Sequence, residues 1–142
     1  MTIRTHAPPI ALLLAMTVAG CAGLPRESDG SRLARYQAVA GAPVSSIAYW
    51  SASAGGFDAI DDEHLLLTTR PRQAYLLRLS GPCLAYDRGS VSLAISSNMG
   101  RISSGFDRVD SLRQPGMSCR IMEIRPLDMK ALRPAEAPAQ PG

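Results

Sequence analysis

The chain has 142 residues, of which 15 are Lys or Arg and 12 are Asp or Glu, for a formal net charge of +3. This length allows one small domain and excludes larger folds such as paired Rossmann halves or a (β/α)8 barrel. The charged fraction of 19% lies below the ~25% usual for soluble domains. These whole-chain averages include the first twenty residues, which are not expected to belong to the folded domain.

The basic charge does not predict nucleic-acid binding. All but one of the Lys and Arg residues are arginine, and they are scattered along the chain. The sequence contains no aromatic-rich strand motif of the kind that RNA-binding domains use to stack bases. We therefore expect no nucleic-acid partner.

Residues 1–20 have the pattern of a secretory signal peptide. Arg4 precedes the apolar run PIALLLAMTVAG at 9–20. This run is too short to cross a membrane as a helix, which needs about 20 residues, and it fits the apolar part of a signal.

The run ends in Val18-Ala19-Gly20-Cys21, which resembles the lipobox of bacterial lipoproteins. The resemblance implies cleavage before Cys21 and attachment of fatty acyl chains such as palmitate to Cys21, which anchor a protein stably when more than one is present. Ala22 favours the outer membrane, with the domain facing the periplasm. The alternative is an ordinary signal with a chance cysteine.

The other two cysteines, Cys83 and Cys119, are predicted to form a disulfide in an oxidising compartment. A metal site would require four ligands, and a catalytic thiol would require a nearby base, whereas His64 is the one His beyond the signal. Closing a loop of this length stabilises a fold by roughly 4 kcal/mol in the chain-entropy estimate.

The chain after Cys21 begins with a polar stretch at 21–30, which is predicted to be a tether. Ser31 is the predicted N-cap of a short helix that ends before Gly41 and Pro43. A β-rich domain is expected over 31–132. The tail at 133–142 contains three Pro and no apolar period, so it is expected to be disordered.

Within the domain, apolar residues recur with a period of two. Val91, Leu93 and Ile95 alternate most clearly with small or polar residues and predict a half-buried strand. Turn signals separate short segments rich in β formers, which lie at 46–51, 57–60, 65–69, 73–80, 91–96, 101–109 and 119–124. This pattern predicts a small antiparallel sandwich or barrel of six to seven short strands, with a short N-terminal helix.

The order of several short motifs over 36–128 resembles an uncharacterised family of small Gram-negative envelope proteins, which are often predicted lipoproteins. The motifs are Tyr75-Leu76-Leu77-Arg78-Leu79, Pro82-Cys83, Phe106-Asp107, Cys119-Arg120-Ile121 and Ile124-Arg125-Pro126. The resemblance implies a place in the envelope and supplies no assigned activity.

The densest group of polar ligands is Asp61-Asp62-Glu63-His64. Asp61, Asp62 and His64 could hold a cation, but a hairpin turn explains the same residues, because Asp favours local hydrogen bonds to the backbone. No G-x-S-x-G elbow accompanies His64. We expect the turn, and we identify no catalytic residues and no cofactor.

Two further groups have competing interpretations. Tyr49, Trp50 and Phe57 form either part of the core or an exposed binding face, since Trp and Tyr are frequent at binding hot spots. Asp107 could form a buried ion pair with Arg108 or Arg120 beside the disulfide, and such a pair would be either structural, which we favour, or part of a binding site.

Taken together, these features predict a non-enzymatic envelope lipoprotein that acts as a binding or structural accessory module. Its partner would be an envelope protein or a cell-wall ligand. The alternatives are an inhibitor of a cell-wall hydrolase and an enzyme acting on peptidoglycan or lipid.

Overall fold

The computed structural model describes residues 27–50, 56–85, 87 and 89–132. The predicted signal peptide, the predicted lipidation site Cys21, most of the predicted tether and the predicted C-terminal tail lie outside the described residues. No helix in the described ranges is long and apolar enough to cross a membrane.

Helix α1 spans Asp29–Ala38 and is capped by Ser28, whose side chain accepts a hydrogen bond from the Ser31 amide at 3.2 Å. The predicted cap at Ser31 is therefore wrong by three residues. A start at Ser28 places Asp29 in the first turn, where the helix dipole favours a negative charge. A start at Ser31 would have placed Arg32 there instead.

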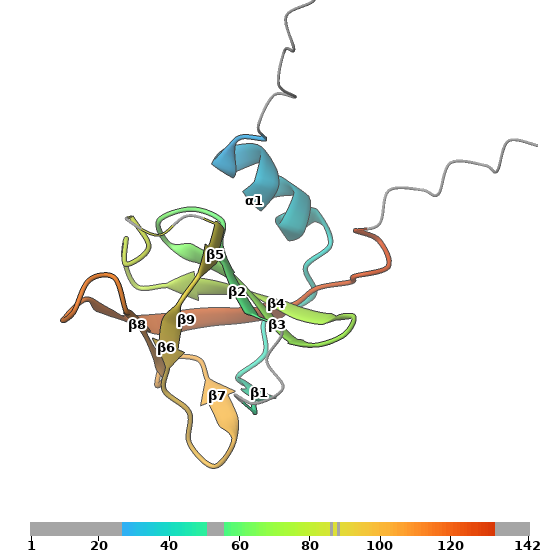
Figure 1. Cartoon of the computed structure of the whole chain (residues 1–142). Helices are drawn as coiled ribbons and strands as arrows, with labels where there is room; N and C mark the ends of the chain where they lie inside the picture. The colour runs from blue at the N-terminus through green and yellow to red at the C-terminus, as the bar shows by residue number, and fades with distance from the viewer. Residues whose placement is uncertain (1–26, 51–55, 86, 88, 133–142) are drawn as a thin grey trace, which may run out of the picture.

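Nine strands follow the helix in the described part of the chain (Figure 1). They are β1 (Ser46–Ala48), β2 (Gly56–Ala59), β3 (His64–Arg70), β4 (Gln73–Leu79), β5 (Gly89–Val91), β6 (Leu93–Ile95), β7 (Arg101–Ser103), β8 (Arg108–Ser111) and β9 (Ser118–Pro126). Seven form one antiparallel sheet in the order β5-β2-β3-β4-β9-β8-β6, and β1 pairs with β7 in a separate two-stranded sheet.

The larger sheet curls into a nearly closed barrel. Its two edge strands, β5 and β6, are separated in the chain by Ser92 alone. Because one residue spans so short a distance, the two edges must lie close together. This geometry confirms the mainly β, antiparallel prediction in its barrel form. The strand predicted at 91–96 is divided at Ser92. Its first residue belongs to β5, at one edge of the sheet, and residues 93–95 form β6, at the other edge.

Alternation along β3 and β4 produces two apolar clusters. Leu65, Leu67, Leu77 and Leu79 are fully or almost fully buried inside the barrel. Ala74 and Leu76 point to the opposite face, where they pack in one cluster with Tyr36 of α1, Ile60 and Leu127. We call this second face, which carries α1, the outer face of the sheet.

Cys83 and Cys119 form the predicted disulfide, with their Cα atoms 5.9 Å apart. Cys83 lies in the segment after β4, and Cys119 is the second residue of β9. Since β9 pairs with β4, the bond fixes the connection that leaves β4 against the start of β9.

Candidate functional site

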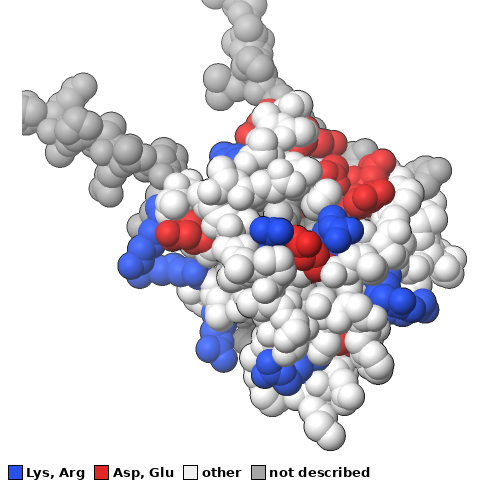
Figure 2. Space-filling model, turned by 180° about the vertical axis from the view of Figure 1, so that it is seen from behind, with Lys and Arg blue, Asp and Glu red and all other residues white. Residues whose placement is uncertain are grey.

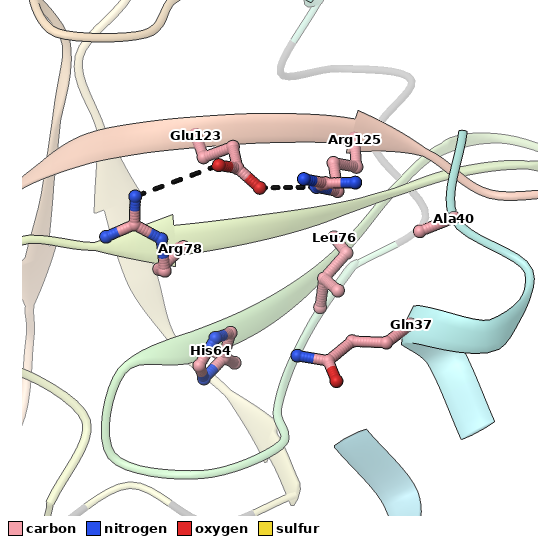
Figure 3. A pocket seen from close by; sticks show the side chains of 7 residues that line it. All are labelled: Gln37, Ala40, His64, Leu76, Arg78, Glu123 and Arg125. Atoms are coloured by element: carbon pink, nitrogen blue, oxygen red, sulfur yellow. Dashed lines mark hydrogen bonds and ion pairs between the residues drawn. The ribbon is translucent and has the colours of Figure 1, made fainter. Parts of the chain in front are cut away.

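A pocket of about 300 Å³ lies between α1 and the outer face of the sheet (Figure 3). We call it the α1 pocket. Helix α1 and the residues directly after it contribute one wall, and β3, β4 and β9 contribute the other. The residues that line it are Gln37, Ala40, His64, Leu76, Arg78, Glu123 and Arg125.

Strand register places the polar side chains of the α1 pocket in a row. His64 on β3 is paired with Arg78 on β4, and Arg78 is paired with Glu123 on β9. Arg125 lies two residues beyond Glu123 and is paired with Leu76. Residues two apart on a strand share a face, so these side chains meet on the side that α1 covers.

Helix α1 is fixed over this face by apolar packing and by one ion pair. Tyr36 is buried against the outer face. The Arg32 guanidinium donates a hydrogen bond to the Asp58 carboxylate of β2 at 2.9 Å. Both contacts keep α1, and with it one wall of the pocket, in place against the sheet.

Glu123 lies between two guanidinium groups. Arg125 Nε donates to Glu123 Oε1, and Arg78 Nη2 is 3.8 Å from Glu123 Oε2. The hydrogen bond from Arg125 lowers the pKa of Glu123 below its ordinary value, and the charge of Arg78 acts in the same direction. The row therefore contains two positive charges and one negative charge.

Asp61 fixes the ring of His64 at the edge of the α1 pocket. Asp61 Oδ1 accepts hydrogen bonds from the backbone amides of Glu63 (2.8 Å) and His64 (2.7 Å), and His64 Nδ1 lies 2.9 Å from both Asp61 oxygens. Burial raises the pKa of Asp61, but these hydrogen bonds outweigh it and leave the pKa below its ordinary value. This is the hairpin turn predicted between β2 and β3.

Asp61, Asp62 and His64 were also the candidate metal ligands. In the ranges that the structure describes, no group of three or more His, Cys, Asp or Glu residues is placed to hold a metal ion. The Asp61 oxygens instead serve the turn and the His64 ring.

His64 also lines a second, more open pocket of about 340 Å³, together with Asp29, Asp61, Asp62, Glu63 and Pro82. Figure 2 shows acidic side chains gathered beside the helix, and below it basic and acidic groups that alternate.

Neither the α1 pocket nor the second pocket is lined by a Ser, Thr or Cys among the described residues. An aspartate-oriented histidine activates such a nucleophile in hydrolytic triads.

The three aromatic residues considered as a binding face do not share one surface. Tyr49 is buried in the barrel core, and Phe57 packs partly buried against that core. Trp50 is 62% exposed, and its ring lies so close to Gly100 that a Cβ there would be 3.3 Å away. Residues 51–55, which link Trp50 to β2, are outside the described ranges.

Among the described residues, Asp107 does not form the ion pair with Arg108 or Arg120 that the sequence allowed. Asp107 is buried, but it accepts hydrogen bonds from Ser96 Oγ and from the Ser103 amide, both at 2.7 Å. Arg108 and Arg120 are exposed and are paired with each other across β8 and β9. Short local hydrogen bonds satisfy the buried carboxylate without burying a guanidinium, which would be costly.

Sequence reasoning named His64 but missed the rest of the α1 pocket, because the row depends on strand pairing between distant residues. One signal was present. Arg78, Glu123 and Arg125 are charged residues at outward positions of strands whose other positions are strongly apolar.

Comparison with known proteins gives a family and no activity. No curated protein and no solved structure matches the chain. A family model described as "Family of unknown function (DUF6491)" matches residues 4–140. This is consistent with the uncharacterised family that the motif order predicted, and the chain belongs to the DUF6491 family.

Proposed function

We propose that the protein is a lipid-anchored, non-enzymatic binding module of the cell envelope, and that the α1 pocket is its ligand site. The lipobox order at 18–21 supports the anchor. The disulfide supports an oxidising compartment, because such bonds persist there and are rare in the cytosol.

We infer the binding function from the shape and the lining of the α1 pocket. Ligand sites of small molecules are concave, have volumes from about 300 Å³, and combine apolar surface with a few oriented polar groups. The α1 pocket combines Leu76 and Ala40 with Arg78, Arg125 and His64. His64, Arg78, Glu123 and Arg125 come from three paired strands, which hold their spacing more firmly than a loop would.

The composition of the pocket favours binding over hydrolysis. A histidine oriented by a carboxylate could act as a general base on water, but the described lining offers no Ser, Thr or Cys for it to activate. The carboxylate of the α1 pocket, Glu123, is engaged by Arg78 and Arg125. The enzyme alternative therefore depends on His64 activating water directly, or on carboxylates that now serve ion pairs and the turn. If the purified protein cleaves a peptidoglycan or lipid substrate and His64→Ala abolishes that turnover, the binding proposal is wrong.

The anchor is tested by mass spectrometry of the protein extracted from membranes. We expect the chain to begin at Cys21 and to carry the added mass of acyl chains. A Cys21→Ser variant should lose this mass and leave the membrane fraction. An unmodified Cys21 in the mature protein would contradict the anchor.

The site is tested by placing a photoreactive amino acid at Gln37 and irradiating intact cells. We expect a covalent adduct of defined mass at Gln37. The same probe at Phe106, an exposed side chain between β7 and β8 and outside the α1 pocket, is the matched control. Adducts at both positions alike, or at neither, would argue against a ligand site under α1.

A further inference from the structure

We propose that the ligand of the α1 pocket is a small monocarboxylate with a short aliphatic body, bound through the guanidinium groups of Arg78 and Arg125. This inference rests on the proposed binding function and specifies the chemistry that the pocket recognises. It follows from the hydrogen-bonding capacity, charge and apolar surface of the pocket.

The α1 pocket has more hydrogen-bond donors than its own acceptors can satisfy. Each guanidinium carries five N–H donors. Within the described residues, the Arg78 guanidinium approaches Glu123 to 3.8 Å, which is longer than a hydrogen bond. Arg125 uses Nε for Glu123 and Nη1 for the Gly41 carbonyl at 3.4 Å. Several donors on both side chains therefore remain for an acceptor-rich ligand.

Glu123 positions the two arginines and leaves one positive charge in excess. Its lowered pKa, caused first by the hydrogen bond from Arg125, keeps it ionised at neutral pH. One carboxylate then faces two guanidinium groups. A monoanion would balance this charge, whereas a phosphate dianion would add repulsion with Glu123.

The geometry of the ligand group also favours a carboxylate. Guanidinium and carboxylate are planar and match each other in paired, parallel hydrogen bonds. Arg78 is the arginine better placed to form such a pair, because 45% of its side chain is exposed and it is held loosely. Arg125, which is tied to Gly41, would supply a fixed second contact.

The apolar part of the pocket is small. Leu76 and Ala40 provide it, from the sheet and from the residues after the helix respectively. A cavity of about 300 Å³ is at the lower limit for small-molecule sites. The body of the ligand should therefore be no larger than a few carbon atoms or one short side chain.

The test is a titration of the full chain with N-acetylalanine, followed by amide and arginine side-chain NMR signals. N-acetylalaninamide is the matched neutral probe, since it differs at the carboxylate alone. We expect N-acetylalanine to shift signals of Arg78, Arg125 and Gln37, and the amide to bind at least tenfold more weakly. Inorganic phosphate is the third probe, and it should also bind more weakly than N-acetylalanine.

Arg78→Gln should weaken N-acetylalanine binding at least tenfold, as expected for the loss of a charge-assisted pair of hydrogen bonds. Arg78→Lys, which keeps the charge and loses the paired geometry, should have an intermediate effect. Arg120→Gln is the matched control, because Arg120 is an exposed arginine on β9 outside the pocket. Unchanged amide spectra away from the pocket would show that each variant folds.

Failure of this inference is distinguishable from failure of the proposed function. Equal binding of N-acetylalanine and its amide, tighter binding of phosphate, or no shift at the pocket would overturn the carboxylate assignment. The adduct at Gln37 in cells would still support a ligand of other chemistry. Loss of that adduct together with these results would remove both proposals.

Discussion

Asp61 is the residue on which the β2–β3 hairpin and the orientation of His64 both depend. It accepts hydrogen bonds from two backbone amides and contacts the His64 ring. Asp61→Ala should lower the free energy of unfolding by about 1–3 kcal/mol at neutral pH, because the amides lose a charged acceptor. Urea denaturation measures this loss, and Glu63→Ala, at an exposed position in the same turn, should change stability little.

The stabilisation of the folded protein by Asp61 should decrease as the pH falls. The hydrogen bonds from Glu63 and His64 outweigh burial and leave the pKa of Asp61 below its ordinary value in the folded protein. The stabilisation is therefore complete above the ordinary carboxylate pKa of about 4 and is lost as pH falls through the lowered value. The difference in the free energy of unfolding between wild type and Asp61→Ala should therefore become smaller at low pH. A difference that is the same at pH 3 and pH 7 would contradict this account.

Asp107 is a second carboxylate with a structural role. Its removal should lower the free energy of unfolding at least as much as the removal of Asp61. It is buried, and with Ser96 and Ser103 it joins the ends of β6, β7 and β8. Asp107→Ala removes the buried acceptor of two partly buried hydrogen bonds, from the Ser96 hydroxyl and the Ser103 amide, so we expect a loss of about 2–3 kcal/mol. Equilibrium unfolding of Asp107→Ala against Asp110→Ala, a partly exposed Asp on β8, tests this. Equal losses of stability in the two variants would show that the hydrogen bonds of Asp107 with Ser96 and Ser103 do not stabilise the fold.

At the level of elements, the cap of α1 connects helix stability to the α1 pocket. Ser28→Ala removes the acceptor of the Ser31 amide and should destabilise the helix by about 1 kcal/mol. Ser31→Ala is the comparison variant, because it removes the hydroxyl contacts of Ser31 with Ser28 but keeps the bond from the Ser31 amide to Ser28 Oγ, and Ala is the better helix former inside the helix. Amide hydrogen exchange over α1 should rise in Ser28→Ala alone. If Ser31→Ala has the larger effect, the helix begins where the sequence first suggested.

The elements themselves were predictable to the extent that they depend on local pattern. The turn at Asp61 and the alternation in β3 and β4 are local, so the sequence predicted them. The division of the 91–96 strand at Ser92 is a consequence of barrel closure, and no feature of the alternation at Val91, Leu93 and Ile95 encodes it. The α1 pocket was missed for the same reason, since the row His64, Arg78 and Glu123 exists only once β3, β4 and β9 are paired.

At the level of the whole molecule, the sheet closes around a small core, and the disulfide adds a constraint that this core needs. A domain of this size buries a smaller fraction of its surface than a larger one, and is correspondingly marginal. Cys83 and Cys119 are separated by 36 residues, and the loop between them contains β5 to β8. The constraint therefore acts on nearly half of the strands, including both edges of the sheet.

Removing the disulfide should lower the free energy of unfolding by roughly 4 kcal/mol, because the unfolded chain regains the entropy of an open loop. The double variant Cys83→Ala/Cys119→Ala tests this by urea denaturation, with reduced wild type as a second sample. Both should lose stability alike, since each opens the same loop. If the double variant loses far more than the reduced protein, the cost lies in the packing of Cys83 in the barrel core rather than in the covalent bond. Equal stability of the oxidised and reduced wild type would show that the sheet closes without the bond, and would weaken the support that the disulfide gives to the proposed oxidising compartment.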